Sequence, residues 1–277
     1  MSFERIFQTS YDESIYRNRL LLDHECPPTD FPFRENEMDT IAGLINPILK
    51  NNKPTNGIIY GSCSTGKTTA IKKILEYLET RSKVVPVYIN CELTESKREV
   101  YKKIIKKAKG VDINQNRIGT TDIHTSISNY LKNSKKGLIV VLDEVDELFI
   151  NKKLKSIIKG LLKLHEEYYG VRVGIYIIVS DSIVCDLSND LKNLLLPTEV
   201  FFRKYPKEHV YEILKERCRL GFVAGAITDN QIKEVTNYSI NIRVGLGILT
   251  ELGDMAERNN SKKIKDEYLD KIVNKII

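Results

Sequence analysis

The stretch that decides the fold spans residues 57–78 and reads GIIYGSCSTGKTTAIKKILEYL. It opens with a short apolar run, passes two glycines that bracket small polar residues, and continues into a lysine and two threonines. Apolar residues recur with helical spacing after Lys67, whereas the run before Gly61 suits a buried strand. The stretch therefore predicts a strand, a glycine-bounded turn and a helix in direct succession.

The turn matches the pattern G-x-x-x-x-G-K-[ST] without a mismatch. Glycines let successive backbone N–H groups point inward, and the N-terminus of the following helix adds partial positive charge, so the turn predicts a phosphate-binding loop. Lys67 suits the β- and γ-phosphates of a nucleoside triphosphate, and the Thr68 hydroxyl suits Mg²⁺. A chance glycine turn is the alternative, and the flanking strand and helix argue against it. The predicted nucleotide-binding residues of the loop are Gly61, Ser64, Thr65, Gly66, Lys67, Thr68 and Thr69.

Two carboxylates follow a second apolar run in the stretch GLIVVLDEVDELF, which begins at Gly137. Carboxylates at the tip of a buried strand are costly unless they face a cation or water. Asp143 is therefore predicted as a magnesium ligand beside the loop threonine, and Glu144 as the residue that orients and activates an attacking water. The alternative, two ordinary surface acids, suits Asp146 and the acid after it better.

Strands and helices alternate up to about residue 202. This alternation predicts a parallel sheet with helices on both faces, so the predicted fold class is α/β. The strands are predicted from runs rich in Val and Ile at residues 57–60, 84–90, 137–142, 171–179 and 199–202.

Beyond residue 202 the patterns are helical, and Thr228 followed by Gln231 has the spacing of a capping box. The chain is therefore predicted to end in a small all-helical lid. The predicted domains are an N-terminal arm at 1–32, a nucleotide-binding core at 33–204 and the lid at 205–277.

The composition is that of a protein with hydrophobic cores: 277 residues, 42% of them hydrophobic, with a net charge of +6. No run approaches the roughly 18 apolar residues of a membrane helix, and the N-terminus lacks a signal-peptide pattern. The five cysteines form no CxxC pair, which argues against a disulfide framework or a zinc site. The sequence therefore predicts a cytoplasmic protein without a membrane partner.

Several stretches together resemble a known family. A P-loop core with the tripeptide LDE and a helical lid resembles the AAA+ ATPases, and more narrowly the archaeal replication initiators of the origin-recognition and cell-division-control type. The resemblance runs from about Phe33 to the last residue. It is carried by FPFRENEMDTI, KPTNGIIYGSCSTGKTTA, VYINCE, VVLDEVDELF, EVFFRKYPKEHVYEILKERCRLGF and GAITDNQI. It implies a P-loop AAA+ core with a parallel five-stranded sheet, ATP or ADP with Mg²⁺ as ligands, and a role in initiating DNA replication.

The resemblance also implies roles for residues of the lid. Tyr205 and Arg217 fall where the family contacts the nucleotide from the first lid helix, and Arg243 falls where it places an arginine that senses the γ-phosphate. An arginine that pairs with the triphosphate and not the diphosphate would couple nucleotide state to the angle between domains. A boundary aromatic and a solvated helix arginine are the alternatives for Tyr205 and Arg217.

The chain departs from the family pattern in three ways. Asp181 stands in the catalytic site, at the end of the fourth strand, where the family has asparagine, and its charge near the γ-phosphate disfavours efficient hydrolysis. The region before the fifth strand lacks the arginine offered to a neighbour's ATP, and Lys192 is the nearest cation. The chain is also expected to lack the winged-helix DNA-binding domain that follows the lid in the family.

Residues 97–109 remain as a candidate DNA contact, because this lysine-rich segment falls where the family inserts DNA-contacting helices. Contacts from it to double-stranded DNA would reach mainly phosphates. The alternative is that these lysines form an ordinary solvated face of the helix and do not contact DNA. The sequence thus supports an ATP-dependent initiator switch that binds DNA, other initiators or helicase-loading proteins. The alternatives are a shortened paralogue that modulates partners without DNA, and a general AAA+ remodelling ATPase.

Overall fold

The structure, a computed structural model, describes residues 14–28, 31–81, 83–94, 96–112, 119–146, 148, 153–166, 169–184 and 187–276. The chain divides into two compact units. One is an α/β unit, Arg34–Arg203, and the other is a helical unit made from Met1–Phe33 and Lys204–Ile277. The chain therefore crosses between the units twice, at Phe33–Arg34 and at Arg203–Lys204.

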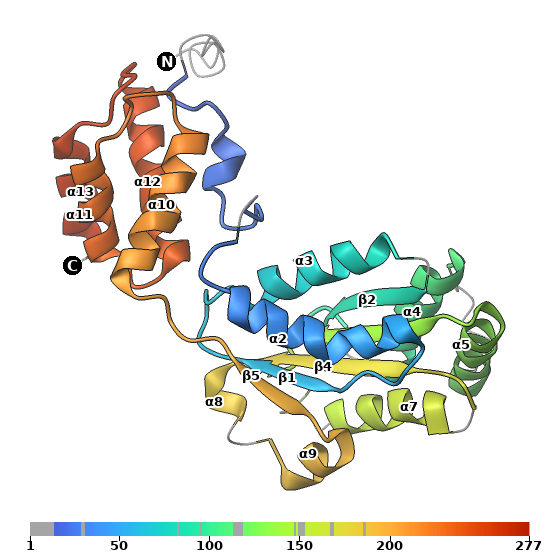
Figure 1. The fold of residues 1–277 in the computed structure, drawn as a ribbon. Helices are drawn as coiled ribbons and strands as arrows, with labels where there is room; N and C mark the ends of the chain where they lie inside the picture. Colours follow the sequence, from blue (N-terminus) through green and yellow to red (C-terminus); the bar gives the residue numbers. More distant parts are fainter. Residues whose placement is uncertain are drawn as a thin grey trace. The chain divides into compact units, whose positions relative to one another are not determined.

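A parallel sheet forms the centre of the α/β unit (Figure 1). The order of its five described strands is β2-β3-β4-β1-β5, so β1 lies between β4 and β5. Because the strands are parallel, their carboxyl ends meet at one edge of the sheet. The strand bounds are β1 Gly57–Tyr60, β2 Val84–Asn90, β3 Gly137–Asp143, β4 Val173–Val179 and β5 Thr198–Phe201.

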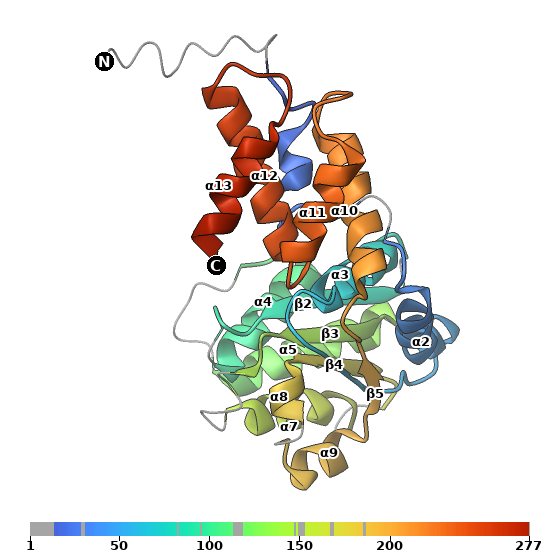
Figure 2. The ribbon, with the colours of Figure 1, turned by 90° about the vertical axis from the view of Figure 1, so that its left-hand side faces the viewer.

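Helices cover both faces of this sheet, as the runs of buried residues in β3 and β4 require. Figure 1 shows α2 and α3 on one side of the sheet and α7 and α9 on the other, and Figure 2 turns the same view by a quarter. The main core packs β2, β3 and β4 against α4, α5 and α7. The helix bounds are α2 Glu35–Ile45, η3 Asn46–Lys50, α3 Lys67–Glu79, α4 Lys97–Lys109, α5 Thr120–Ser134, α7 Leu154–Glu166, α8 Asp181–Val184 and α9 Asn189–Leu195.

Two local features differ from the sequence prediction. The apolar residues between Glu37 and Leu49 recur with helical spacing and predict a single helix, but α2 ends at Ile45 and the tighter 3-10 helix η3 follows. Pro47 lies at the start of η3, and its missing N–H cannot continue the α-helical hydrogen-bond ladder. The short helices α8 and α9 were not predicted, because four and seven residues are too few to show a helical period.

The helical unit packs four described α-helices around their own core. Thr228 and Gln231 form the predicted capping box at the start of α11, where Thr228 Oγ1 accepts from the Gln231 backbone N–H at 3.3 Å and Gln231 Oε1 accepts from the Thr228 backbone N–H at 3.0 Å. The helices are α10 Lys207–Gly221, α11 Asp229–Tyr238, α12 Ile242–Arg258 and α13 Asp266–Ile276, and η2 Arg19–Leu22 precedes them in the chain.

The described residues of the predicted N-terminal arm, 14–28, pack within the helical unit. Ile15 and Leu22 are buried in its core. The Tyr16 ring stacks on Phe222 at a centroid distance of 5.3 Å, and the Arg17 N–H donates to the Gly221 carbonyl at 2.8 Å. This segment is therefore a structural part of the lid fold. None of the helices in the described part of the chain combines the length and apolar character that a bilayer crossing requires.

Candidate nucleotide-binding site

The predicted phosphate loop lies between β1 and α3, at the carboxyl edge of the sheet. Gly61 has φ 149°, and a Cβ there would lie 2.3 Å from the Phe202 carbonyl oxygen, so no other residue fits this position. Gly66 caps α3 in the left-handed region, with φ 92°. Both glycines of the sequence pattern are thus required by backbone geometry.

Lys67 occupies the first position of α3 and folds back over the loop. Its Nζ donates to the carbonyl oxygens of Gly61 at 2.7 Å and Ser62 at 2.9 Å. Burial lowers the pKa of this ammonium, and nearby acidic groups, including Asp143 and Asp181, oppose that shift. An ammonium held by neutral carbonyl groups among carboxylates is ready to exchange those bonds for phosphate oxygens.

Asp143 ends β3 and is 1% exposed, so its carboxylate depends on protein hydrogen bonds. Its Oδ2 accepts from Thr68 Oγ1 and from the Tyr88 hydroxyl, each at 2.7 Å, and its Oδ1 accepts from the Glu144 backbone N–H at 2.9 Å. Burial and the neighbouring Asp143 charge raise the pKa of Tyr88, which keeps its hydroxyl a donor. The structure thus brings together Thr68 and Asp143, the two predicted metal ligands.

Thr68 and Asp143 suit a magnesium ion better than they suit a metal ion whose ligands all come from the protein. The described residues include no cluster of three or more His, Cys, Asp or Glu arranged to hold a metal. Magnesium in proteins keeps several waters and binds through one or two carboxylates together with substrate phosphates. A threonine hydroxyl and a carboxylate in contact beside a phosphate loop match that requirement.

Glu144 follows Asp143 and adopts a left-handed backbone conformation, with φ 52°. Its side chain is exposed, unlike that of Asp143. Partial burial of the carboxylate and, after it, the charges of Asp143 and Asp146 raise the pKa of Glu144. A carboxylate of raised basicity that reaches solvent beside the loop is suited to accept a proton from water.

Asp181 begins α8, directly after β4, and contacts the phosphate loop. Its Oδ2 accepts from Ser62 Oγ at 2.8 Å. The order of the strands explains this contact, because β4 is the neighbour of β1. The structure therefore places a negative charge against the loop that is predicted to hold phosphates.

Three predicted nucleotide contacts belong to the helical unit. Tyr205 is partly buried and lies edge-on to His209 at a centroid distance of 6.5 Å, and Arg243 is exposed in the first turn of α12. Arg217 is buried on α10, and its guanidinium donates to the carbonyl oxygens of Leu21 and Cys26, both at 2.8 Å. Arg217 thus fastens the N-terminal segment to α10, and the nucleotide roles of all three residues stay predictions.

Sequence reasoning missed three residues of the site. Tyr88 holds Asp143 and Ser62 holds Asp181, while Arg34 donates through Nε to the Thr65 carbonyl oxygen of the loop at 3.0 Å. Each contact joins residues distant in sequence, so no local pattern could have indicated it. Arg34 lies in the FPFRENEMDTI stretch that carries the family resemblance, but the resemblance assigns it no role.

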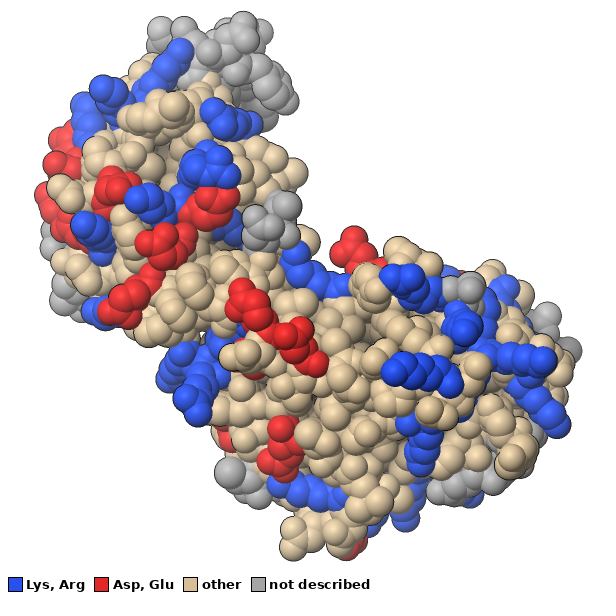
Figure 3. All heavy atoms as spheres, in the orientation of Figure 1, with Lys and Arg blue, Asp and Glu red and all other residues tan. Residues whose placement is uncertain are grey.

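The lysine-rich segment forms the exposed side of α4, while its apolar residues are buried in the main core. Several of its lysines contact neighbouring groups: Lys106 lies 2.6 Å from Asp112, and Lys109 donates to Ser126 Oγ at 2.7 Å. An exposed ion pair such as Lys106–Asp112 is weak, so its lysine can exchange the carboxylate for another anion. Figure 3 has the orientation of Figure 1. At the end of the α/β unit where Figure 1 labels α3, α4 and α5, most of the charged side chains on the visible face are basic.

The strand order and the phosphate loop with its buried aspartate define a P-loop nucleotide-binding fold of the AAA+ ATPase class. Comparison with known families agrees: the family described as "ATPase domain predominantly from Archaea" matches residues 31–191, and the "Cdc6 AAA+ ATPase-type lid domain" matches residues 211–272. An ORC1-type DNA replication protein 2 of Methanothermobacter thermautotrophicus is 34% identical over 94% of this chain and 70% of the relative's length. The chain belongs to the family of archaeal ORC1-type DNA replication proteins.

Further relatives and solved structures support this placement. An ORC1-type DNA replication protein 2 of Methanosarcina mazei is 30% identical over 94% of this chain and 71% of its own length. The Aeropyrum pernix ORC1 protein, solved in complex with DNA, has a TM-score of 0.80 at 25% identity and matches 95% of this chain and 70% of that one. The Aeropyrum pernix ORC2 protein has a TM-score of 0.81 at 19% identity, with 95% and 72% coverage, which supports the fold.

Proposed function

We propose that this chain is a nucleotide-dependent switch of the replication-initiator type, which binds ATP or ADP with magnesium and hydrolyses ATP slowly. The observation that carries the proposal is the contact between Thr68 and Asp143 beside a complete phosphate loop. Family membership supports a role in replication initiation, and the ATPase description of the matched domain supports the nucleotide.

Each residue of the site would have a distinct role in binding or hydrolysis. The loop amides and Lys67 bind phosphate oxygens, while Tyr88 holds Asp143 in place beside Thr68. Magnesium, when bound by Thr68 and Asp143, supplies positive charge to the phosphates. Glu144 accepts a proton from water, aided by its raised pKa. The Asp181 carboxylate lies beside the loop and repels the negative phosphates, and this repulsion keeps turnover slow.

The nucleotide carried by the purified protein, together with its hydrolysis rate, tests this proposal. Retained ADP with slow turnover is the expected result, because the site is built to hold a nucleotide and Asp181 disfavours hydrolysis. A protein that binds neither ATP nor ADP in the presence of magnesium would refute it. Fast turnover without retained nucleotide would instead indicate a remodelling motor.

We further propose that the output of the switch is binding to double-stranded DNA through the exposed lysines of α4. The Aeropyrum pernix ORC1 protein was solved in complex with DNA and is 25% identical to this chain. The side of α4 that carries its lysines is exposed, so they can exchange their surface partners for phosphates. Partner proteins of the initiator or helicase-loading kind are the second proposed output.

Fluorescence anisotropy with duplex DNA across a salt series tests the proposed DNA binding. The slope of log affinity against log salt is negative, and each lost phosphate contact makes it less steep by about 0.9. Replacing Lys106 and Lys109 with alanine is therefore expected to make the slope less steep by about 2. The matched control replaces Lys159 and Lys163, which are exposed on α7, and is expected to leave the slope unchanged. No DNA affinity at low salt with ATP present would favour the paralogue that modulates a partner protein.

A further inference from the structure

Arg34 is a buried arginine that joins separate parts of the α/β unit. Its side chain is 4% exposed, and its guanidinium lies 5.4 Å from the centre of the Phe202 ring. Its Nη1 pairs with Glu37 Oε1 at 2.7 Å. Its Nε donates to the Thr65 carbonyl oxygen at 3.0 Å, and its Nη2 donates to the Arg203 carbonyl oxygen. A planar fork of this kind fixes the direction of the groups it binds.

The bond to Thr65 acts on the phosphate loop itself. A peptide unit is planar and trans, so its carbonyl and its N–H point in opposite directions. Holding the Thr65 carbonyl toward Arg34 therefore directs the Gly66 N–H to the opposite side. Gly66 caps α3, and N–H groups at this place are the ones that a phosphate-binding loop presents to its ligand.

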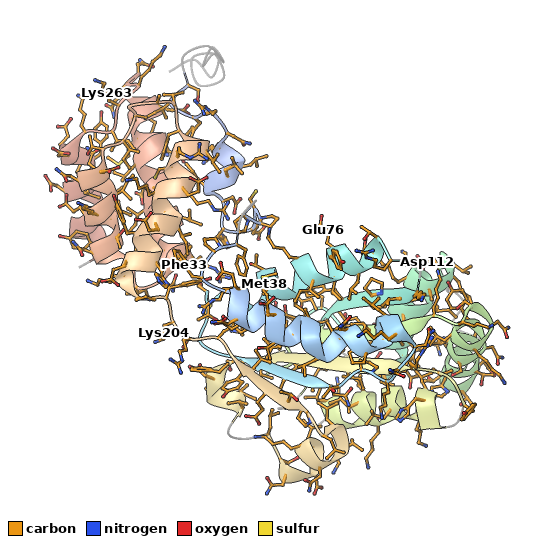
Figure 4. All side chains as sticks on the ribbon, in the orientation of Figure 1. Phe33, Met38, Glu76, Asp112, Lys204 and Lys263 are labelled. Carbon is orange, nitrogen blue, oxygen red and sulfur yellow. The ribbon has the colours of Figure 1, made fainter. Side chains whose placement is uncertain are left out.

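The bond to Arg203 acts on the connection to the helical unit. Arg34 is the first residue of the α/β unit and Arg203 is its last, so one side chain ties together the two places where the chain leaves this unit. Figure 4 labels Phe33 and Lys204, the neighbours of these residues on the other side of each crossing. The segment before Arg203 also contacts the strand that leads into the loop, since the Phe202 N–H donates to the carbonyl of Tyr60, the last residue of β1, at 2.8 Å.

We propose that Arg34 is a positioning residue for nucleotide binding: it sets the Thr65–Gly66 peptide for the phosphates and couples the loop to the chain crossing at Arg203. The coupling follows from geometry, because a phosphate that pulls on the Gly66 N–H moves the same peptide whose carbonyl Arg34 holds. A shift of the guanidinium then reaches Arg203 through the same rigid fork. This inference rests on nucleotide binding by the loop and adds a residue to it.

The test replaces Arg34 with lysine and, separately, with glutamine. Lysine keeps the charge but cannot hold two carbonyl groups in fixed directions, so ADP affinity is expected to fall about tenfold in both variants. The matched control is Arg172, whose guanidinium donates to Asn51 Oδ1 at 2.8 Å and to the Lys135 carbonyl, neither of which belongs to the loop or to a crossing. Arg172→Lys is expected to bind ADP like the native chain.

Hydrogen exchange at residues 203–205 separates positioning from a merely structural role. In the native chain, saturating ADP is expected to slow exchange at this crossing. In Arg34→Lys, ADP added to saturation is expected to protect the loop and leave the crossing unchanged. ADP affinity within twofold of the native value, or a crossing that still responds, would overturn the inference.

A measurement on the native chain covers the case in which both variants fail to fold. The Nε–H of Arg34 is bonded to Thr65 and is expected to give a protected ¹⁵N–¹H signal that shifts when ADP binds. ADP binding without a shift of this signal would also overturn the inference. A native chain that does not bind ADP at all would instead refute the proposed function, so the two failures are distinguishable.

Discussion

Replacing Lys67 with methionine tests the phosphate loop most directly. The ammonium donates to two loop carbonyls, those of Gly61 and Ser62, and nucleotide binding would exchange both bonds for bonds to phosphate oxygens. Methionine has a similar length and no charge, so it fills the position without offering either bond. The nucleotide then keeps the loop amides and loses the lysine.

The magnitude follows from the strength of the bonds exchanged. Hydrogen bonds to charged groups contribute about 1.5–3 kcal/mol each, so a gain of about 1.5 kcal/mol per exchanged bond lies at the lower end. Two bonds give about 3 kcal/mol, which is a loss of roughly 150-fold in ADP or ATP affinity. The stability of the folded chain is not expected to fall. Burial lowers the pKa of Lys67, which means that holding the charge costs free energy in the folded protein, so removing it is expected not to lower the unfolding temperature measured without nucleotide.

Isothermal titration with ADP and magnesium measures the affinity, and thermal unfolding without nucleotide measures the stability. The matched control is Lys73→Met, about 1.7 turns further along the same helix, which is expected to bind ADP like the native chain. An affinity within threefold of the native value in a folded Lys67→Met variant would refute the assignment of the loop.

Three other substitutions give distinct expected outcomes. Glu144→Gln is expected to keep ADP affinity while lowering hydrolysis about 10²-fold or more. In the native chain the rate is expected to rise with pH through the raised pKa of Glu144, because the ionised carboxylate is the proton acceptor, and the variant is expected to lack this rise. Asp181→Asn keeps an acceptor for Ser62 and removes a charge, so the affinity for ATP relative to ADP is expected to rise by roughly fivefold, or about 1 kcal/mol, in paired titrations. Tyr88→Phe removes a donor to the buried carboxylate of Asp143, and urea denaturation is expected to show a loss of about 1–3 kcal/mol in unfolding free energy; no loss would contradict the role given to its hydroxyl.

The local elements could be predicted from sequence because their signals are local. The apolar run of β2 and the capping box of α11 lie where the sequence predicts them. The phosphate loop could be predicted for the same reason, since glycines, lysine and threonine must follow one another at fixed spacing to form it. The short helix α9 escaped because seven residues carry no clear period.

The sequence by itself determined the class of site: a loop for phosphates at Gly61–Thr68 and an acidic strand end at Asp143. The tertiary structure alone decided which side chains from elsewhere in the chain hold the residues of this site in place. The Tyr88 hydroxyl meets Asp143 across 55 residues, and Arg34 meets Arg203 across 169. The physical reason is that such contacts depend on strand order and on the direction of each side chain, both of which are set only when the whole sheet packs. They therefore produce no pattern of residue spacing that could be recognised in the sequence.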